Sequence, residues 1–230
     1  YFSYPVGLAT DTSGNLYLAD MLNHRVQIRD ATGNWTAIGS EGNGLAEFLA
    51  PNGVAVDTAG NFYVADTGNN RIQIRNAAGT WTSIGENGDG LGQFYHPTGI
   101  AVDTSGNLYV ADSGNNRIQV RDTDGAWTAI TTPGSDLGSF SSPYSLTLRA
   151  GKLYVADRYN NRVLVRDAAG NWTAIGSEGT ALGQFESPSG VAVDAAGNLY
   201  VADSDNNRLQ VRDTSGNWTR YGGGASGSAA

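Results

Sequence analysis

The chain has 230 residues, a formal net charge of −8 at pH 7 and a single lysine, Lys152, so its composition argues against a nucleic-acid-binding surface, which needs clustered basic residues. Cysteine is absent, which excludes disulfides, thiolate metal sites and cysteine nucleophiles. No apolar run approaches the length of a membrane span. We recognise no signal peptide in the given residues, and from the start at Tyr1, inside a motif, we expect an excised domain.

One pattern occurs five times along the chain. Each copy opens with a proline and closes near a tryptophan, and successive prolines or tryptophans are 45 or 46 residues apart. A fixed period in this range is typical of repeat architectures, in which each unit is too small to bury its apolar face alone. The prolines are Pro5, Pro51, Pro97, Pro143 and Pro188, and the tryptophans are Trp35, Trp81, Trp127, Trp172 and Trp218.

The third copy predicts four strands joined by short turns. Strand-forming residues dominate four segments, and the third of these alternates polar and apolar side chains as a half-exposed strand does. The segments are 99–103, 108–112, 117–121 and 127–130. Asp-x-x-Gly turns join the first strand to the second and the third to the fourth, because Asp caps such a turn and Gly adopts the left-handed conformation. No segment has helical periodicity of useful length.

Five such copies predict an all-β fold, a β-propeller of five four-stranded antiparallel blades. A parallel β-helix has shorter coils, and alternating β and α units need helices that the sequence lacks. We expect one propeller domain over residues 1–221 and a flexible Gly/Ser/Ala tail at 222–230. If the ring closes, we expect a monomer; the alternatives are an open fragment or association with another chain that completes the ring. The expected blades are about 2–46, 47–92, 93–138, 139–183 and 184–221.

Three motifs recur in a fixed order: Gly-Val-Ala-Val-Asp, Asn-Leu-Tyr-Val-Ala-Asp and Asn-Asn-Arg-Ile-Gln-Val. Over nearly the whole chain they resemble the NHL repeat, whose name-giving Asn-His pair occurs here as Asn23-His24. The resemblance implies that the first strand of each blade lies nearest the central axis and the fourth outermost. Together with the absence of cysteine, it favours an extracytoplasmic or secreted bacterial protein. Some NHL propellers bind RNA, which the net charge of this chain disfavours.

Among the recurrent motifs, the Asp-x-x-Asn-Asn-Arg element has the composition most typical of a binding or catalytic site. It could hold a cation or grip a carboxylate, but it occurs in every copy, whereas a binding site is needed only once. Asn tolerates left-handed turn geometry and Asp accepts hydrogen bonds from backbone N–H groups, so we interpret the element as structural. Its aspartates are Asp20, Asp66, Asp112, Asp157 and Asp203.

Catalysis and metal binding have few candidate residues. The two histidines, His24 and His96, lie in loops of non-adjacent copies, and zinc hydrolysis needs about three protein ligands. No nucleophile elbow or phosphate loop occurs, so we predict no catalytic residue, no cofactor and no metal ligand set. One alternative stays open, a structural calcium ion at the axis held by a partial ring of aspartates that Arg149 interrupts in the fourth copy. Those aspartates are Asp11, Asp57, Asp103 and Asp194.

The copies differ mainly at one end of the predicted propeller. Successive antiparallel turns lie at alternate ends, so the uniform Asp-x-x-Gly hairpins share one end, and the Asn-Asn connections and inter-blade loops share the other, the loop-rich end. Drift in loops explains part of the variation, and the remainder favours a recognition surface, since aromatic residues and Arg are common binding anchors. The candidate binding residues there are Tyr4, Met21, Leu22, His24, Tyr95, His96, Tyr144, Arg158, Tyr159 and Asp205.

The favoured hypothesis is a non-catalytic binding or scaffold propeller, not an enzyme, that recognises a protein, peptide or glycan through the loop-rich end. One alternative is a metal-dependent lyase-type enzyme with its site at the central axis, because lyases of that kind resemble this fold. Another is an engineered or recently amplified repeat scaffold without a specific ligand. The small differences among the copies are consistent with this alternative. We expect neither a nucleic acid nor a membrane as partner.

Overall fold

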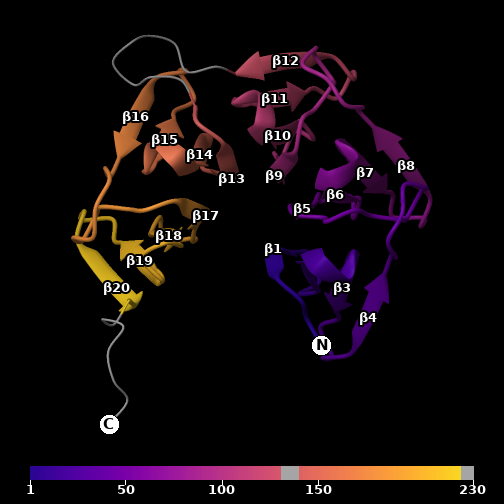
Figure 1. Ribbon diagram of the computed structural model, residues 1–230, viewed down its shortest axis with the longest axis horizontal. Coiled ribbons are helices and arrows are strands. Elements are labelled where there is room, and N and C mark those ends of the chain that lie inside the picture. The colour runs from indigo at the N-terminus through magenta and orange to yellow at the C-terminus, as the bar shows by residue number, and fades with distance from the viewer. Residues whose placement is uncertain (131–139, 224–230) are drawn as a thin grey trace. The chain divides into compact units, whose positions relative to one another are not determined.

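The computed structural model describes residues 1–130 and 140–223. In this part of the chain, twenty strands form five four-stranded sheets, and all neighbouring strands within a sheet are antiparallel (Figure 1). Every sheet follows chain order from its first to its fourth strand, so each copy of the sequence pattern is one meander. The predicted fold class, an all-β propeller of five four-stranded antiparallel blades, is therefore confirmed.

Short turns separate the strands of each blade. Blade one contains β1 (Pro5–Thr10), β2 (Leu16–Asp20), β3 (Arg25–Arg29) and β4 (Trp35–Ile38). Blade two contains β5 (Val54–Val56), β6 (Phe62–Asp66), β7 (Arg71–Arg75) and β8 (Trp81–Ile84). Blade three contains β9 (Pro97–Val102), β10 (Leu108–Asp112), β11 (Arg117–Arg121) and β12 (Trp127–Ile130). Blade four contains β13 (Pro143–Arg149), β14 (Lys152–Asp157), β15 (Arg162–Arg166) and β16 (Trp172–Ile175). Blade five contains β17 (Pro188–Val193), β18 (Leu199–Asp203), β19 (Arg208–Arg212) and β20 (Trp218–Gly222).

A single 3-10 turn joins the second and third strands in blades one to four. These turns are η1 (Met21–Asn23), η2 (Thr67–Asn69), η3 (Ser113–Asn115) and η4 (Arg158–Asn160). The residue after each turn is left-handed, with φ of 52° at His24 and 53° at Asn70. The second Asn of the repeat stands at this position in blades two to five because Asn tolerates the left-handed region better than most residues.

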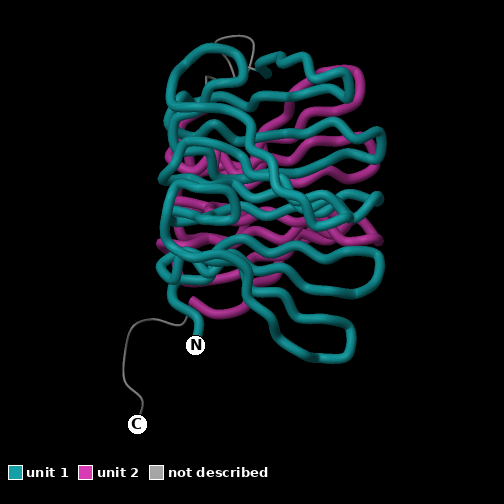
Figure 2. Tube along the Cα trace, turned by 90° about the vertical axis from the view of Figure 1, so that its right-hand side faces the viewer, with its two compact units in different colours: residues 1–131 teal, residues 132–230 magenta. Residues whose placement is uncertain are grey.

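The chain divides into two compact units, residues 1–131 and 132–230, which Figure 2 colours separately. The first unit holds blades one to three, where β1 contacts β5 and β5 contacts β9. The second holds blades four and five, where β13 contacts β17. Because β20 ends at Gly222 and residues from 224 onward lie outside the described part, the proposed domain limits and the flexible tail stay predictions.

Apolar side chains between successive blades make up the core of each unit. In the first unit, Val26 of blade one packs with Val54 and Val64 of blade two, and Ile72 of blade two packs with Ile100 of blade three. The equivalent residues of blades four and five form the core of the second unit. The core therefore lies on the faces of the blades rather than within any single blade, as expected for units that cannot fold alone.

An aromatic pair closes the outer part of each blade. The Phe of the Phe-x-x-Pro motif meets the Trp of the fourth strand edge to face, for example Phe94 and Trp127 with ring centroids 5.3 Å apart. Gly85 packs directly on the Phe94 ring at φ 86°, so a side chain there would both clash and be strained. The tryptophans are thus blade-packing residues, as their equal spacing predicts.

We expect Phe94→Ala to lower the free energy of unfolding by about 3–5 kcal/mol, because the ring is fully buried and its removal leaves a cavity. Phe2→Ala is the matched control: Phe2 makes the same edge-to-face contact with Trp35 at 5.3 Å, but it is 47% exposed. Denaturant unfolding of both variants measures the difference. Equal losses would contradict the view that burial between blades, rather than the aromatic pair itself, stabilises the fold.

Candidate functional site

The two variable segments of each blade lie side by side at the loop-rich end. A backbone hydrogen bond joins the turn after the second strand to the segment before the proline: Gly68 N–H donates to the Leu49 carbonyl, and Gly114 N–H donates to the Tyr95 carbonyl, both at 2.8 Å. The same bond recurs in blade four, from Tyr159 N–H to the Ser141 carbonyl at 3.1 Å. Within each blade, the residues that differ most among the copies therefore form one continuous surface.

Each residue before a blade-opening proline has a left-handed backbone. The φ values are 54° at Tyr4, 48° at Ala50, 51° at His96, 50° at Ser142 and 49° at Ser187. Such a conformation is unfavourable for a residue with a side chain, so the surroundings must hold it in place. None of these positions carries glycine, so this backbone conformation could not be predicted from the residue types.

A hydrogen bond from the preceding blade helps to hold the left-handed residue before the proline in place. His96 N–H donates to Asn70 Oδ1 at 2.7 Å, and Ser187 N–H donates to Asn161 Oδ1 at 2.9 Å. In blade one, His24 replaces the Asn, and its Nδ1 accepts the Ala50 N–H at 3.0 Å. A nitrogen that accepts a hydrogen bond must present a lone pair, so the Nδ1 atom of His24 carries no proton in this contact. His24, a candidate binding residue, thus performs the structural task of an asparagine.

The candidate residues of the first unit form separate patches. Tyr4 and Leu22 are more than half exposed in blade one, where Met21 is partly buried. In blade three, Tyr95 and His96 are both exposed, and their rings meet edge to face with centroids 4.6 Å apart.

The candidate residues of blade four are in direct contact with one another. The Arg158 guanidinium lies 5.0 Å from the ring centroid of Tyr144 and 5.4 Å from that of Tyr159, so it stacks on both rings. Tyr159 is 61% exposed, whereas Tyr144 and Arg158 are half-buried. We call these three residues the arginine–tyrosine cluster. Asp205 of blade five is exposed, and its N–H donates to the Glu186 carbonyl.

The sequence interpretation missed one recurrent feature of the loop-rich end. Each described inter-blade loop presents a leucine that is more than half exposed: Leu45, Leu91 and Leu182. A side-chain oxygen caps each of these turns, for example Glu47 Oε2, which accepts the Gly44 N–H at 2.9 Å. A leucine at a fixed repeat position normally indicates a core residue, so the exposure of these leucines could not be predicted from the sequence.

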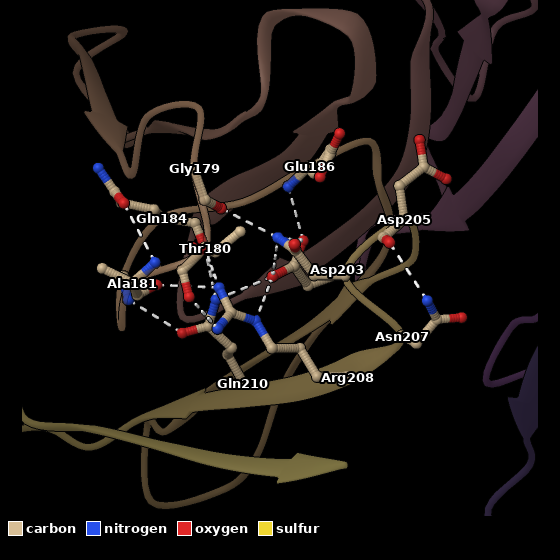
Figure 3. Close-up of polar contacts among 12 residues, drawn as sticks. Gly179, Thr180, Ala181, Gln184, Glu186, Asp203, Asp205, Asn207, Arg208 and Gln210 are labelled. Atoms are coloured by element: carbon tan, nitrogen blue, oxygen red, sulfur yellow. Dashed lines mark hydrogen bonds and ion pairs between the residues drawn. The ribbon is translucent and has the colours of Figure 1, made fainter. Parts of the chain in front are cut away.

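The Asp-x-x-Asn-Asn-Arg element forms a buried polar hub, drawn for blade five in Figure 3. Asp203, fully buried, accepts hydrogen bonds from the Glu186 N–H at 2.6 Å, Arg208 Nε at 2.6 Å and Gln210 Nε2 at 3.1 Å. Asn206 Nδ2 adds a further bond to each carboxylate oxygen. Burying a charge in this way is tolerable because it is paired and fully hydrogen-bonded.

The same side chains hold the preceding inter-blade loop. Arg208 donates to the carbonyls of Thr180, Ala181 and Gln184. Gln210 Nε2 also donates to the Gln184 carbonyl, and Gln210 Oε1 accepts the Gly183 N–H at 2.9 Å. A loop rich in glycine, with few apolar contacts of its own, is thereby fixed by bonds to buried groups of the blade it enters.

The hub recurs in the other blades, with one substitution. Asp66 and Asp112 bind the equivalent Asn, Arg and Gln residues and the N–H groups of Leu49 and Tyr95. In blade four, Leu164 stands where the other blades have Gln, and it is fully buried. The predicted structural interpretation of the motif is confirmed: its polar atoms are occupied within the fold.

The aspartates of the first hairpin cap their own turns. Asp11 Oδ1 accepts the N–H groups of Ser13 and Asn15, and Oδ2 accepts Asn15 Nδ2 and the Tyr17 hydroxyl. Burial raises the pKa of Asp11, but these bonds outweigh burial and lower it. The oxygens proposed to form an axial calcium site are therefore engaged by the hairpin.

No group of three or more His, Asp or Glu side chains is arranged to hold a metal ion within residues 1–130 and 140–223. Over the same residues, no helix is long and apolar enough to cross a membrane.

We expect Asp66→Ala to destabilise the protein by about 3–5 kcal/mol, since it leaves the Arg71 guanidinium buried without its counter-ion. Gln73→Leu is the matched control, because blade four carries a leucine naturally at this position; its expected cost is about 1–2 kcal/mol from lost loop bonds. Urea unfolding compares the two. A smaller loss for Asp66→Ala than for Gln73→Leu would contradict the hub as described.

The hub of blade one also predicts a pH dependence. Burial raises the pKa of Asp20, but hydrogen bonds from Ser3 N–H, Asn23, Arg25 and Gln27 outweigh it and lower the pKa to about 2. Because the folded-state pKa lies below the unfolded value of roughly 4, the stabilisation is complete above about pH 4 and disappears as the pH falls through 2. Denaturant midpoints measured between pH 5 and pH 2 should fall over this range.

Asp20→Asn should flatten this pH dependence. Denaturant midpoints of Asp20→Asn that fall as steeply as those of wild type between pH 5 and pH 2 would contradict this role of the buried carboxylate.

Four segments of the chain match the sequence profile of the NHL repeat: residues 2–28, 48–74, 94–120 and 185–211. They fall in blades one, two, three and five and span the first three strands of each. No curated protein matches the chain.

Solved structures similar to this chain include enzymes and a protein complex. A streptogramin B lyase is 18% identical, with a TM-score of 0.70, over 96% of this chain and 69% of the lyase. The virginiamycin B lyase from Staphylococcus aureus is 16% identical, with a TM-score of 0.66, over 94% of this chain and 69% of that one. A chain of the nidogen/laminin complex is 22% identical, with a TM-score of 0.73, over 92% of this chain and 76% of that one.

At these identities the likeness is one of fold. The repeat matches and the five antiparallel four-stranded blades agree with it, and with the motifs that recur in the sequence. The repeat matches at four positions are consistent with the NHL-repeat β-propeller family.

Proposed function

We propose that this propeller is a non-catalytic binding module that recognises a protein, peptide or glycan through its loop-rich end. The arginine–tyrosine cluster of blade four is its main anchor. The observation that carries this proposal is the stacking of the Arg158 guanidinium on two tyrosine rings. Aromatic residues and Arg contribute most of the energy in many binding sites, because they bury a large surface and keep a directional polar group.

The electrostatics of Arg158 suggest the kind of ligand. The ion pairs found among the described residues are the five hub pairs, and Arg158 belongs to none of them. Its Nε is buried and has no hydrogen-bond partner in the same part of the chain. A guanidinium held by two rings and lacking a counter-ion suits a carboxylate, such as an acidic peptide side chain or a uronic acid.

The comparison with the nidogen/laminin complex supports a protein partner, since a chain of similar fold is found there in a protein–protein complex. The streptogramin B lyase likeness supports the rival hypothesis of an axial enzyme site. Against that rival, His24 is engaged in an inter-blade hydrogen bond and Asp11 in its own turn. Our proposal therefore assigns no catalytic residue.

The exposed residues of the first unit are proposed as secondary contacts. Tyr95 and His96 offer a paired aromatic surface on blade three, and Tyr4 and Leu22 offer apolar area on blade one. We treat these patches as independent of the arginine–tyrosine cluster, so that each is tested by its own variant.

We expect Arg158→Ala to weaken binding to acidic ligands roughly tenfold or more. Screening of the wild-type protein on peptide and glycan arrays supplies the ligands, and titration calorimetry supplies the affinities. Arg158→Lys keeps the charge but loses the planar stacking, so its affinity should lie between those of wild type and Arg158→Ala.

The matched control is Arg149→Ala, which removes an exposed arginine from the hairpin at the opposite end of the same blade. Its affinity should equal that of wild type, and thermal unfolding should change little in either variant. Two outcomes contradict the proposal: equal weakening by Arg158→Ala and Arg149→Ala, or no bound ligand on either array. A rise in melting temperature on addition of Ca²⁺ or Zn²⁺ would favour the enzyme hypothesis instead.

A further inference from the structure

The loop that joins β8 to β9 (Figure 1) borders a hollow of about 370 Å³. The residues that line it are Gly85, Glu86, Leu91, Gly92 and Gln93. All five belong to the first compact unit, so one loop of one unit forms the hollow. A volume in this range is typical of sites that hold a small molecule or a side chain of a partner.

Hydrogen bonds to blade three fix the backbone that lines the hollow. Gly92 N–H donates to Gln119 Oε1 at 2.9 Å. The Gln93 carbonyl accepts bonds from Arg117 Nη2 at 3.0 Å and from Gln119 Nε2 at 2.6 Å. Gln93 Oε1 also caps the turn, since it accepts the Gly90 N–H at 3.0 Å. A wall that is already ordered loses little conformational freedom on binding, which favours affinity.

The lining combines an apolar side chain with a carboxylate. Leu91 is 58% exposed and supplies the apolar area. Glu86 is exposed as well, and its Oε1 accepts Gln93 Nε2 at 3.0 Å, which orients the carboxylate. Within residues 1–130 and 140–223, Glu86 Oε2 accepts no hydrogen bond and Glu86 forms no ion pair. The hollow therefore carries a negative charge that the described residues leave without a counter-ion.

This carboxylate distinguishes the loop from its two described counterparts. Ser40 and Ser177 stand at the position of Glu86 in the loops that enter blades two and five. In all three loops, the carbonyl of this residue accepts the N–H of the buried Phe, at 2.8 or 2.9 Å. Because Ser makes the same backbone contact, the loop conformation does not require the carboxylate of Glu86.

We propose that this hollow binds a lysine or arginine side chain of a partner peptide or protein. The aliphatic stem of that side chain lies against Leu91, and its charged end pairs with Glu86 Oε2. A long cationic side chain fits both features, because its methylene groups separate an apolar stem from a charged head. The net charge of −8 adds a general attraction for a basic partner.

The hollow is separate from the arginine–tyrosine cluster. That cluster lies in blade four and suits a carboxylate, whereas the hollow lies before blade three and suits a cation. Each of the two sites can therefore be tested and rejected without the other.

Amide chemical shifts in NMR spectra measure binding of three probe peptides: acetyl-Gly-Arg-Gly-amide, acetyl-Gly-Lys-Gly-amide and acetyl-Gly-Gln-Gly-amide. We expect both cationic peptides to shift the amides of Glu86, Leu91 and Gly92, with a Kd of about 1–10 mM, because a single side chain buries little surface. The glutamine peptide has a polar side chain without a charge, so it should leave these amides unshifted.

Glu86→Ser tests the carboxylate, and the serine of the other two loops indicates that the fold is kept, which circular dichroism verifies. It should weaken binding of the cationic peptides at least about fivefold. Leu91→Ala should weaken it about threefold through lost apolar contact. Glu41→Asn is the matched control: it removes one carboxylate from the loop before blade two and installs the residue found at Asn87, so it should bind like wild type.

Three results contradict the proposal. The first is that neither cationic peptide shifts these amides at about 20 mM. The second is that the glutamine peptide shifts them as much as the cationic peptides do. The third is that Glu86→Ser and Glu41→Asn weaken binding equally, since the attraction is then one of net charge and not of this hollow.

Discussion

The buried carboxylate at the end of each second strand is the constraint on which the rest of this structure depends. It collects the Asn, Arg and Gln of the following turn and strand, and those side chains hold the loop that enters the blade. A buried charge of this kind is costly unless every bond is made, so the motif tolerates little change. That requirement explains why Asp, Asn and Arg recur in all five copies. It also places the repeat's most polar motif among the structural elements rather than in a binding site.

The side chains around the hub differ among the blades, whereas the hub itself is nearly constant. The residues flanking each carboxylate project from a backbone that the hub fixes, so a substitution there alters the surface without altering the support. Blade four differs strongly from its neighbours here, since Arg158 and Tyr159 stand where blades two and three have Thr-Gly and Ser-Gly, and Tyr144 follows the proline. The same blade carries Leu164 in place of Gln and Arg149 in place of the turn aspartate, and it is the blade without an NHL repeat match. Departure from the repeat and the gathering of binding-type residues therefore coincide.

Periodicity predicted most of the fold, because turn chemistry and strand patterns are local. The strands expected for the third copy agree with β9 to β12 to within two residues at their ends, and β10, β11 and β12 agree fully. The candidate site was predictable only as a set of segments, since whether two side chains touch depends on rotamers and neighbours. Thus the stacking of Arg158 on Tyr144 and Tyr159 could not be foreseen, nor the use of His24 as an inter-blade acceptor. Leu45 shows the same limit, because an apolar residue at a repeat position predicts burial while its exposure depends on the side chains that surround it.

Hydrogen exchange at single amides tests the central claim most directly. The N–H groups of Leu49, Tyr95 and Glu186 lie in loops, yet each donates to a buried hub carboxylate. If the hub holds these loops, the three amides exchange as slowly as those of the second strands, through opening of the blade as a whole. Exchange at the rate of an unstructured peptide, while the strand amides stay protected, would show that the loops open independently and would contradict the account.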